Sequence, residues 1–421
     1  MSNRQAALTV LLMAWAPCTF AQAPIEVSII EVGKIWDQAP HNAFTDLLRW
    51  QDQFYCALRE GRGHVSADGR IRVISSQDGD CWQSATLVEL NGYDLRDAHL
   101  SVTPDRQLML IGGTAPRKKD NQSAPTGTFA SFSHDGTGWT KPKIIVEPGR
   151  WLWCVTWYQG KAYGVTYGGR DTPPYIQLLR STDGVNFRTH VSKLFGKGWP
   201  TEVTLRFAGN GTCYALVRRD RHGDEPNSAV LGVSSGDYRQ WNWHDLGPEF
   251  NSFGGPNFIQ LPSGHWIGAG RMHQGGAHTA VTLLDMKNHK MTKLLKLPSG
   301  GDTSYPGLLW YNNTLYVSYY SSHEGKTSIY LAKLNVTAKC PRCSSAMKTV
   351  PVLVGLPTTE MTAKLKRGKA LLAGCVGDPH NPEYACICPS CRKFKTVRMT
   401  YWRDLPAEFG IIGLRQERSQ K

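Results

Sequence analysis

Glu202 and Arg218 stand near the two ends of one predicted β-hairpin, on either side of a Gly-Asn-Gly turn at 209–211. Residues 203–207 are mostly apolar or β-branched, and an apolar run returns at 213–217, which is the pattern of two paired strands. Because a hairpin brings its outer ends together, we expect the carboxylate and the guanidinium to share one rim of the fold. A carboxylate there can take up a proton, and a guanidinium can bind an anionic group.

The same hairpin pattern occurs six times along the chain. It is found at 47–58, 100–111, 155–165, 204–217, 258–268 and 308–319, with successive turns 49 to 55 residues apart. A unit of roughly fifty residues with one hairpin in each is typical of propeller blades, since a single small sheet cannot bury its own faces. The sequence therefore predicts an all-β fold, a six-bladed β-propeller. Residues 26–32 are expected to close the ring beside residues 328–334, which removes a free sheet edge.

In a propeller the starts of the innermost strands converge near the central axis. One residue from each repeat is expected there: Asp46, Asp97, Trp153, Glu202, Asn257 and Tyr305. Carboxylates, an amide, an indole and a phenol around one funnel suit a sugar-binding site. For any one Asp or Asn, the alternative interpretation is that it caps a strand end.

Four segments share the pattern S-x-D-G-x-x-W/F, with the last copy weakened; they begin at Ser76, Ser133, Ser181 and Ser235. In such turns the Ser and Asp side chains bond nearby amides, and Gly accepts a positive φ. These segments resemble the Asp boxes of the sialidase superfamily, at one residue shorter than the commonest spacing. The placement of Glu202 and Arg218 also resembles the fourth blade of bacterial sialidases, and Ser304-Tyr305 is similar to the segment carrying their tyrosine nucleophile. The resemblance covers about residues 40–335.

The resemblance implies a retaining mechanism in which Glu202 removes the proton of Tyr305 and the phenolate attacks the anomeric carbon. A sialic acid carries a carboxylate on that carbon, which repels an Asp or Glu nucleophile but not a neutral phenol. The substrate carboxylate in turn needs guanidiniums, because their planar forks bind it through paired hydrogen bonds. By their placement in the family pattern, Arg218 and Arg271 fill two such positions.

The first repeat holds a partial match. Residues 60–62 resemble the A-E-x-R segment of sialidases, and the general acid that follows is expected at Asp68, with His64 as the alternative. Position relative to the turn favours Arg59 as a site arginine, whereas the motif favours Arg62. The family's first arginine has no counterpart at 43–46, where the sequence reads Ala-Phe-Thr-Asp. An acid at Asp46 would repel a substrate carboxylate.

Two C-P-x-C knuckles follow the repeats. Cys340, Cys343, Cys388 and Cys391 have the arrangement that completes a tetrahedral zinc site, and the pattern resembles zinc-ribbon modules. The metal is expected to be structural, and no cofactor is expected for catalysis. Disulfides are the alternative, because an exported protein meets an oxidising compartment.

Residues 1–23 have the features of a signal peptide, which predicts a secreted or periplasmic protein; lipidation at Cys18 is the alternative. The propeller is expected over 24–335 and the zinc-ribbon-like module with a basic tail over 336–421. Of the net charge of +14, +9 lies from residue 336 onward, so the charge does not indicate specific nucleic-acid binding by the propeller. No other stretch is apolar enough to span a bilayer.

The predicted function is that of an exported, sialidase-like exo-glycosidase whose partner is a glycan or glycoconjugate with an acidic sugar. The competing hypothesis is a non-catalytic propeller that binds glycans through Trp153 and the arginines. The missing first arginine favours binding alone, whereas the set Glu202, Arg218, Arg271 and Tyr305 favours an enzyme.

Overall fold

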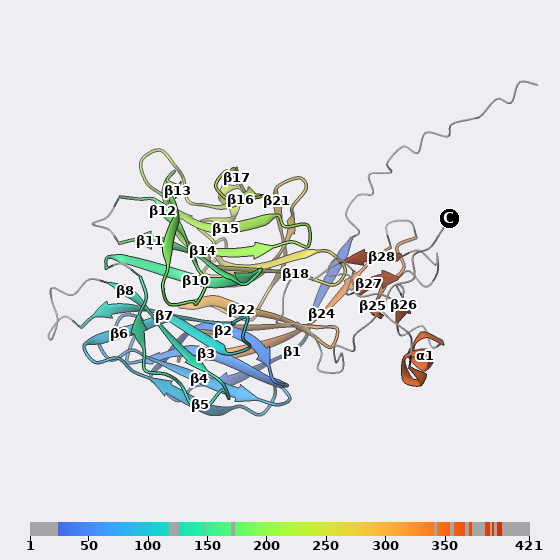
Figure 1. Ribbon diagram of the computed structural model, residues 1–421, viewed down its shortest axis with the longest axis horizontal. Coiled ribbons are helices and arrows are strands. Elements are labelled where there is room, and N and C mark those ends of the chain that lie inside the picture. Colours follow the sequence, from blue (N-terminus) through green and yellow to red (C-terminus); the bar gives the residue numbers. More distant parts are fainter. Residues whose placement is uncertain are drawn as a thin grey trace, which may run out of the picture.

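Six four-stranded antiparallel sheets are arranged around a common centre in a computed structural model of the chain (Figure 1). The structure describes residues 24–117, 126–146, 148–169, 173–340, 343–353, 358–366, 370–372, 384–387, 390 and 394–397. The predicted six-bladed β-propeller is therefore confirmed. The predicted signal peptide, residues 1–23, lies outside the described residues.

The blades follow one another along the chain, each running from its innermost to its outermost strand. Blade 1 contains β2 (His41–Trp50), β3 (Gln53–Gly61), β4 (Arg70–Ser76) and β5 (Gln83–Val88). Blade 2 contains β6 (Tyr93–Val102), β7 (Leu108–Pro116), β8 (Gly127–Ser133) and β9 (Lys143–Ile144). Blade 3 contains β10 (Arg150–Tyr158), β11 (Lys161–Gly168), β12 (Ile176–Ser181) and β13 (Arg188–Phe195). Blade 4 contains β14 (Trp199–Phe207), β15 (Cys213–Asp220), β16 (Ser228–Ser234) and β17 (Asn242–Asp245); a 3-10 turn, η1 (Pro248–Phe250), leads into blade 5, which contains β18 (Gly254–Gln260), β19 (Trp266–Met272), β20 (His278–Asp285) and β21 (Lys290–Lys296).

Blade 6 joins the two ends of the propeller. It contains β22 (Thr303–Tyr311), β23 (Thr314–Ser321), β24 (Ser328–Ala338) and, as its outermost strand, β1 (Ile25–Trp36). The β1–β24 pairing runs antiparallel from Ile25 opposite Ala338 to Trp36 opposite Ile329. The predicted closure is confirmed, and it gives the last blade its fourth strand from the start of the chain.

Each innermost strand carries a β-bulge at the same register. In every blade two consecutive residues of the inner strand oppose one residue of the second strand; the pairs are 44–45, 97–98, 153–154, 201–202, 255–256 and 305–306. The first bulge residue has a positive φ in four blades: Phe44 (57°), Asp97 (49°), Gly255 (63°) and Tyr305 (50°). Such bulges turn a side chain away from the regular alternation of a strand and are frequent beside active sites.

The turn segments with the S-x-D-G pattern lie after the third strands of their blades. Asp78 illustrates the geometry: its Oδ1 accepts hydrogen bonds from the backbone amides of Asp80 and Cys81, at 2.8 and 3.0 Å. These amides lower the pKa of Asp78 to about 2. Asp135 accepts equivalent bonds from Thr137 and Gly138 in blade 2. The segments hold outer loops and lie away from the central bulges.

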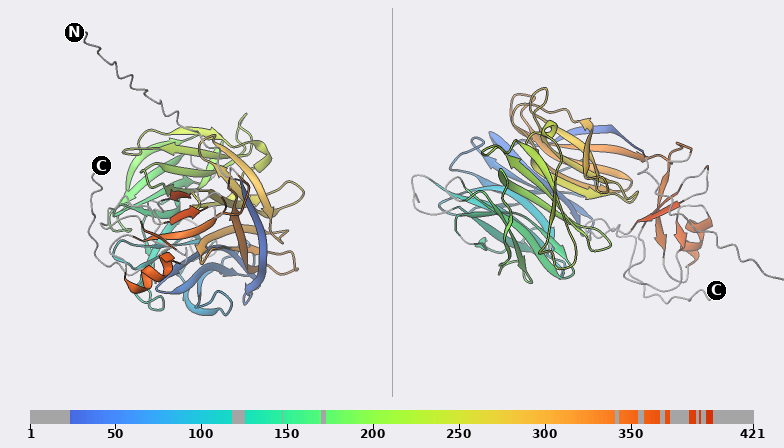
Figure 2. Two further views of the ribbon diagram at one scale, coloured as in Figure 1. Left: turned by 90° about the vertical axis from the view of Figure 1, so that its right-hand side faces the viewer. Right: turned by 90° about the horizontal axis from the view of Figure 1, so that it is seen from above.

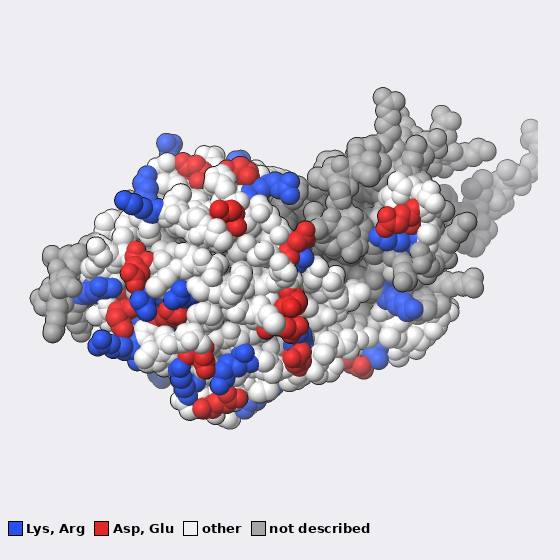
Figure 3. Space-filling view, turned by 90° about the horizontal axis from the view of Figure 1, so that it is seen from below, with Lys and Arg blue, Asp and Glu red and all other residues white. Residues whose placement is uncertain are grey.

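A small sheet follows the propeller, in the order β26 (Leu371–Leu372), β25 (Lys348–Leu353), β27 (Tyr384–Ile387) and β28 (Phe394–Val397), with one helix, α1 (Thr359–Lys366). It lies beside the propeller near β24 and β1 (Figures 1 and 2). No helix in the described part of the chain has the length and apolar character needed to cross a bilayer. Positive and negative side chains are interspersed over the described face seen in Figure 3.

Candidate active site

The bulges of blades 4 and 6 bring Glu202 and Tyr305 into contact. The Tyr305 hydroxyl donates to Glu202 Oε1 at 2.6 Å, although the two residues are 103 positions apart. Both side chains are buried, with Glu202 5% and Tyr305 9% exposed. The contact expected from the sequence is therefore present.

Blade 5 lies between these two residues and holds the carboxylate through its backbone. The amide of Gly255 donates to Glu202 Oε2 at 2.7 Å. A Cβ at Gly255 would lie 2.6 Å from the Cα of Tyr305, and its φ of 63° also disfavours a side chain. Glycine at this bulge thus allows the backbones of blades 5 and 6 to approach closely enough to place the phenol on the carboxylate.

Arg218 completes a triangle with the acid and the phenol. It is the β15 residue opposite the Thr201–Glu202 bulge, because Pro200 pairs with Arg219 and Val203 with Val217. Its Nη1 donates to Glu202 Oε1 at 2.7 Å and to the Tyr305 hydroxyl at 3.0 Å. Its Nε and Nη2 contact Asp220. A cation at this position can stabilise negative charge that develops on the phenol.

Arg271 lies on the other side of the phenol. Its guanidinium carbon is 5.3 Å from the centre of the Tyr305 ring. Its Nε is buried without a hydrogen-bond partner, and no carboxylate pairs with Arg271 among the described residues. This cation therefore remains available for an anionic ligand, unlike Arg218, which two carboxylates already contact.

Burial, with the nearby charge of Glu202 second, raises the pKa of Tyr305 far above its usual value. Arg218 and Arg271 act in the opposite direction but do not cancel the effect. The resting phenol is consequently neutral, and it can become a nucleophile only if a base takes its proton during attack. Glu202 is the base in contact with it.

Asp97 occupies the bulge of blade 2 and faces the same space. Burial, and the charge of Glu202 after it, raise the pKa of Asp97 to about 6. In the described part of the chain no hydrogen bond is made to its carboxyl group, and the charges of His99 and Arg96 only partly offset the increase. A carboxylic acid that keeps its proton up to about pH 6 can act as a general acid.

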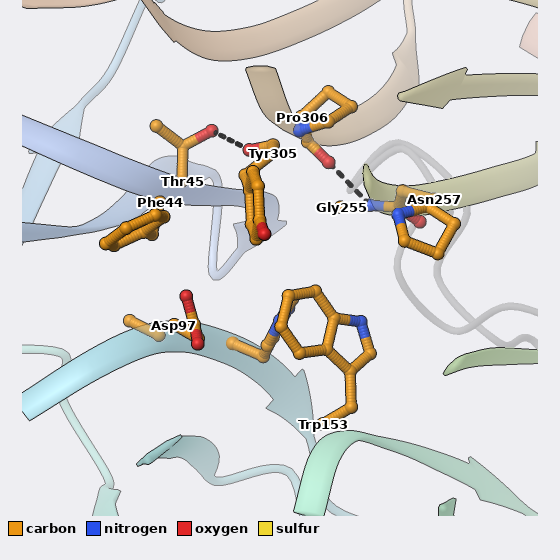
Figure 4. Close-up of a pocket in the computed structure, with 11 residues that line it drawn as sticks. Phe44, Thr45, Asp97, Trp153, Gly255, Asn257, Tyr305 and Pro306 are labelled. Carbon is orange, nitrogen blue, oxygen red and sulfur yellow. Dashed lines mark hydrogen bonds between the residues drawn. The ribbon is translucent and has the colours of Figure 1, made fainter. Parts of the chain in front are cut away.

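A pocket with a volume of about 300 Å³ opens above these groups. Its lining comes from blades 1, 2, 3 and 6: Phe44, His64, Arg96, Asp97, Thr126, Trp151, Tyr167, Gly169 and Tyr305. A narrower cavity of about 10 Å³ lies at the ring axis, where Phe44, Asp97, Trp153 and Tyr305 surround one space (Figure 4). The larger pocket has the size of a small-ligand site.

Trp153, the residue expected to bind a sugar, lies too deep in the site to offer an open surface. Only 1% of it is exposed, and its ring packs against His99 and Tyr305, with centroids 4.7 and 5.7 Å apart. Trp151 and Tyr167, which the sequence analysis did not single out, line the open pocket instead and stack on each other. Trp153 therefore forms the base of the site, and these two rings form its wall.

Asp46 and Asn257 have structural contacts, as in the strand-capping alternative. Asp46 accepts hydrogen bonds from the amides of Leu47 and Leu100, linking blades 1 and 2. Asn257 lines the narrow cavity, but its side chain bonds the amide of Phe258 and the carbonyl of Pro306. Both residues come directly after the bulge of their strand. Their side chains bond the neighbouring blade and do not line the larger pocket.

The site arginine expected in blade 1 is not in the pocket. Arg59 is fully buried and binds Asp94 at 2.9 Å, together with the Gly63 and Ser66 carbonyls, so it shapes the following loop. Arg62, with 87% of its side chain exposed, pairs with Asp68 at 3.6 Å. Neither Arg62 nor Asp68 is among the residues that line the pocket of about 300 Å³.

His64, the alternative acid, does line the pocket. Its ring packs against Phe44, with centroids 5.1 Å apart, and its Nδ1 lies 2.8 Å from Asp302. The sequence analysis missed Asp302, Arg96 and Phe44. Phe44, Asp97 and Tyr305 are each the first residue of a bulge. This shared position could have identified Phe44, but only once the bulges are known.

No protein-family model and no curated protein sequence matches the chain. Solved structures resemble it. A protein of unknown function from Dyadobacter fermentans superposes with a TM-score of 0.64 at 17% identity, over 74% of this chain and 99% of that one. An α-L-arabinofuranosidase of Fusarium graminearum in complex with arabinobiose gives a TM-score of 0.58 at 13% identity, over 72% and 97%.

The sialidase of Trypanosoma rangeli in complex with the inhibitor DANA gives a TM-score of 0.53 at 11% identity. The match covers 74% of this chain but 60% of that sialidase. The chain has the six-bladed propeller fold of these glycosidases. At such identities the likeness establishes the fold alone, so the function depends on the geometry of the site.

Proposed function

We propose that the protein is a retaining glycoside hydrolase that uses Tyr305 as nucleophile and acts on an acidic sugar. The observation that carries this proposal is the buried triangle of Tyr305, Glu202 and Arg218 beneath the pocket. A phenol in contact with a base suits an anomeric centre next to a carboxylate, because a charged carboxylate nucleophile would be repelled there.

The first step transfers two protons and exchanges one bond. Glu202 takes the proton of Tyr305 as the phenolic oxygen bonds to the anomeric carbon, and Arg218 stabilises the developing phenolate. The bond from the anomeric carbon to the leaving-group oxygen breaks, and Asp97 gives that oxygen its proton. In the second step Asp97 takes a proton from water, the water oxygen displaces Tyr305, and Glu202 returns the proton to the phenol.

Arg271 is the group proposed to bind the substrate carboxylate. It faces Tyr305 and has no carboxylate partner among the residues that the structure describes, whereas Arg218 is already paired. Blade 1 supplies Phe44 and Thr45 at its bulge in place of an arginine. The proposed substrate is therefore an acidic sugar held by fewer guanidiniums than a sialidase uses.

The experiment that tests the function is hydrolysis of a panel of aryl glycosides that includes sialosides, uronides and arabinofuranosides. We expect turnover of an acidic member with retention at the anomeric carbon, and loss of that turnover in Tyr305→Phe. Binding of glycans without turnover of any panel member would instead support the alternative, a non-catalytic glycan-binding propeller.

Asp97→Asn is expected to identify the general acid. Because the pKa of Asp97 in the ligand-free protein is about 6, its acid form is present below that pH and is lost above it, so kcat/KM should fall as pH rises through about 6. The variant should lack this limb and lose roughly 10²- to 10⁴-fold in kcat on substrates with poor leaving groups. A pH series of kcat/KM measures this limb.

The matched control is Asp68→Asn, which changes the exposed acid of the blade 1 loop. We expect its pH profile to follow the unaltered protein. A normal profile in Asp97→Asn together with an altered one in Asp68→Asn would assign the acid to Asp68 instead.

We also propose that Cys340, Cys343, Cys388 and Cys391 hold a structural zinc ion. Cys340 and Cys343 lie on a turn closed by a hydrogen bond from the Ser344 amide to the Cys340 carbonyl, whereas Cys388 and Cys391 lie outside the described residues. A hydrogen bond near the two knuckles supports this proposal. Ser390, next to Cys391, donates its hydroxyl to the hydroxyl oxygen of Ser345, two residues after Cys343, at 3.1 Å. Thiolates in this spacing suit zinc.

We expect about one zinc per chain after exhaustive dialysis, lost in Cys340→Ser and retained in Cys81→Ser, an exposed cysteine of blade 1. Elemental analysis of the full chain provides the measurement. Zinc-free protein with oxidised knuckle cysteines would contradict the proposal.

We also propose that residues 1–23 direct export of the protein.

A further inference from the structure

Three side chains from distant parts of the chain converge at the edge of the pocket. His41 begins β2, His64 lies in the loop after β3, and Asp302 immediately precedes β22. His41 Nε2 and His64 Nδ1 each lie 2.8 Å from the same oxygen, Asp302 Oδ2. All three potential ligand atoms fall within 4.8 Å of one another.

The two 2.8 Å separations are hydrogen-bond distances, and they also fit a shared cation whose ligands lie at right angles. Two ligand atoms at right angles, each about 2.1 Å from a metal ion, are about 3 Å apart, close to the 2.8 Å of both His–Asp pairs. The two imidazole rings are nearly perpendicular, at 81°, with centroids 5.8 Å apart. This places two nitrogens around one point without a clash between the rings.

The carboxylate is held from its other side. Tyr320 donates its hydroxyl to Asp302 Oδ1 at 3.0 Å, leaving Oδ2 directed at the two histidines. A hydrogen-bonded, ionised carboxylate is the form in which Asp binds metal.

One side of the cluster is closed and the other is open. The side chain of His41 is 9% exposed, that of Asp302 28% and that of His64 47%. His64 also lines the pocket above Tyr305. A cation bound here would therefore have three protein ligands and free positions facing solvent and the pocket.

We propose that His41, His64 and Asp302 form a binding site for a divalent transition-metal ion. Two imidazoles and one carboxylate favour ions such as Zn²⁺ or Ni²⁺ over Mg²⁺ or Ca²⁺, which prefer all-oxygen sites. Resting on the proposed function, the ion would supply positive charge on the blade 1 side of the pocket, where the bulge carries Phe44 and no arginine.

The affinity is expected to be modest. His41 Nδ1 is buried without a hydrogen-bond partner, and loss of such an outer contact typically costs 10- to 100-fold in affinity. The cluster is thus expected to lose its ion during dialysis that a four-cysteine site survives.

The test is calorimetric titration of the full-length protein, as isolated and without chelator, with ZnCl₂ and separately with CaCl₂ at pH 7.5. We expect one added equivalent of Zn²⁺ per chain and at least tenfold weaker binding of Ca²⁺. His64→Ala and Asp302→Asn should each weaken Zn²⁺ binding by tenfold or more. His64→Ala changes a half-exposed loop residue, and its thermal unfolding in EDTA checks that the fold persists.

A matched control is the double variant His244→Ala, His289→Ala. These two histidines, on blades 4 and 5, stack on each other with centroids 3.5 Å apart, and they do not belong to a three-ligand cluster among the residues that the structure describes. They should leave the titration unchanged. No Zn²⁺ binding by the unaltered protein beyond the cysteine site, or the same affinity in His64→Ala, would overturn the proposal whatever the protein hydrolyses.

Discussion

Tyr305→Phe is expected to lower kcat by about 10³-fold or more, because it removes the proposed nucleophile while leaving the ring in place. The phenylalanine keeps the packing of Tyr305 against Phe44, Trp153 and Tyr320. Glu202 retains its bonds from Arg218 and Gly255, so no buried carboxylate is left without a donor. The measurement is steady-state hydrolysis of the substrate found in the aryl glycoside panel.

Tyr319→Phe provides a control in the same blade. Tyr319 is also buried, and its hydroxyl donates to the carbonyl of Pro298 away from the pocket. Its loss should cost about 1 kcal/mol of stability and leave kcat unchanged. Near-normal turnover in Tyr305→Phe would rule out the phenol as nucleophile.

Glu202→Gln is the second large effect, and we expect it to lower kcat by roughly 10²- to 10⁴-fold. The amide has the size of the carboxylate and can still accept from Gly255, but it cannot take the proton of Tyr305. Because burial holds the pKa of Tyr305 far above its usual value, the phenol keeps its proton at neutral pH unless a base removes it. Binding should change less than turnover, which separate kcat and KM values would show.

Glu225→Gln is the matched change for Glu202→Gln. Glu225 lies in the same blade and also pairs with an arginine, Arg219, at 3.0 Å, but 39% of its side chain is exposed. It should retain full turnover.

If the acid and the phenol act as one unit, the double variant Tyr305→Phe, Glu202→Gln should lose little more turnover than the worse single variant. Losses that add independently would show that the two residues have separate roles.

Much of the fold could be predicted from local pattern. Each hairpin consists of two runs of apolar, β-branched residues around a short polar turn, and a spacing of about fifty residues fixed the number of blades. These features depend on residues close together in the chain. The ring closure by β1 was also predictable, since a short strand-like segment before the first repeat needs a sheet edge to pair with.

The blade 1 arginines show where local pattern fails. Arg59 and Arg271 occupy the same register, each opposite the residue that precedes a bulge. Arg271 faces the ring of Tyr305, whereas Arg59 turns into the blade because Asp94 of the next blade binds it. Nothing near either arginine in the sequence distinguishes the two environments.

The sequence by itself determined the propeller, its six blades and the pairing of Glu202 with Arg218 across one hairpin, because each is set by strand periodicity and turn residues. Only the tertiary structure decided which side chains share the pocket. Bulges and a glycine without a Cβ place Tyr305 on Glu202, and ring closure brings Asp302 to His41 and His64. Such contacts join residues up to 261 positions apart, so they depend on how the blades pack and not on spacing along the chain.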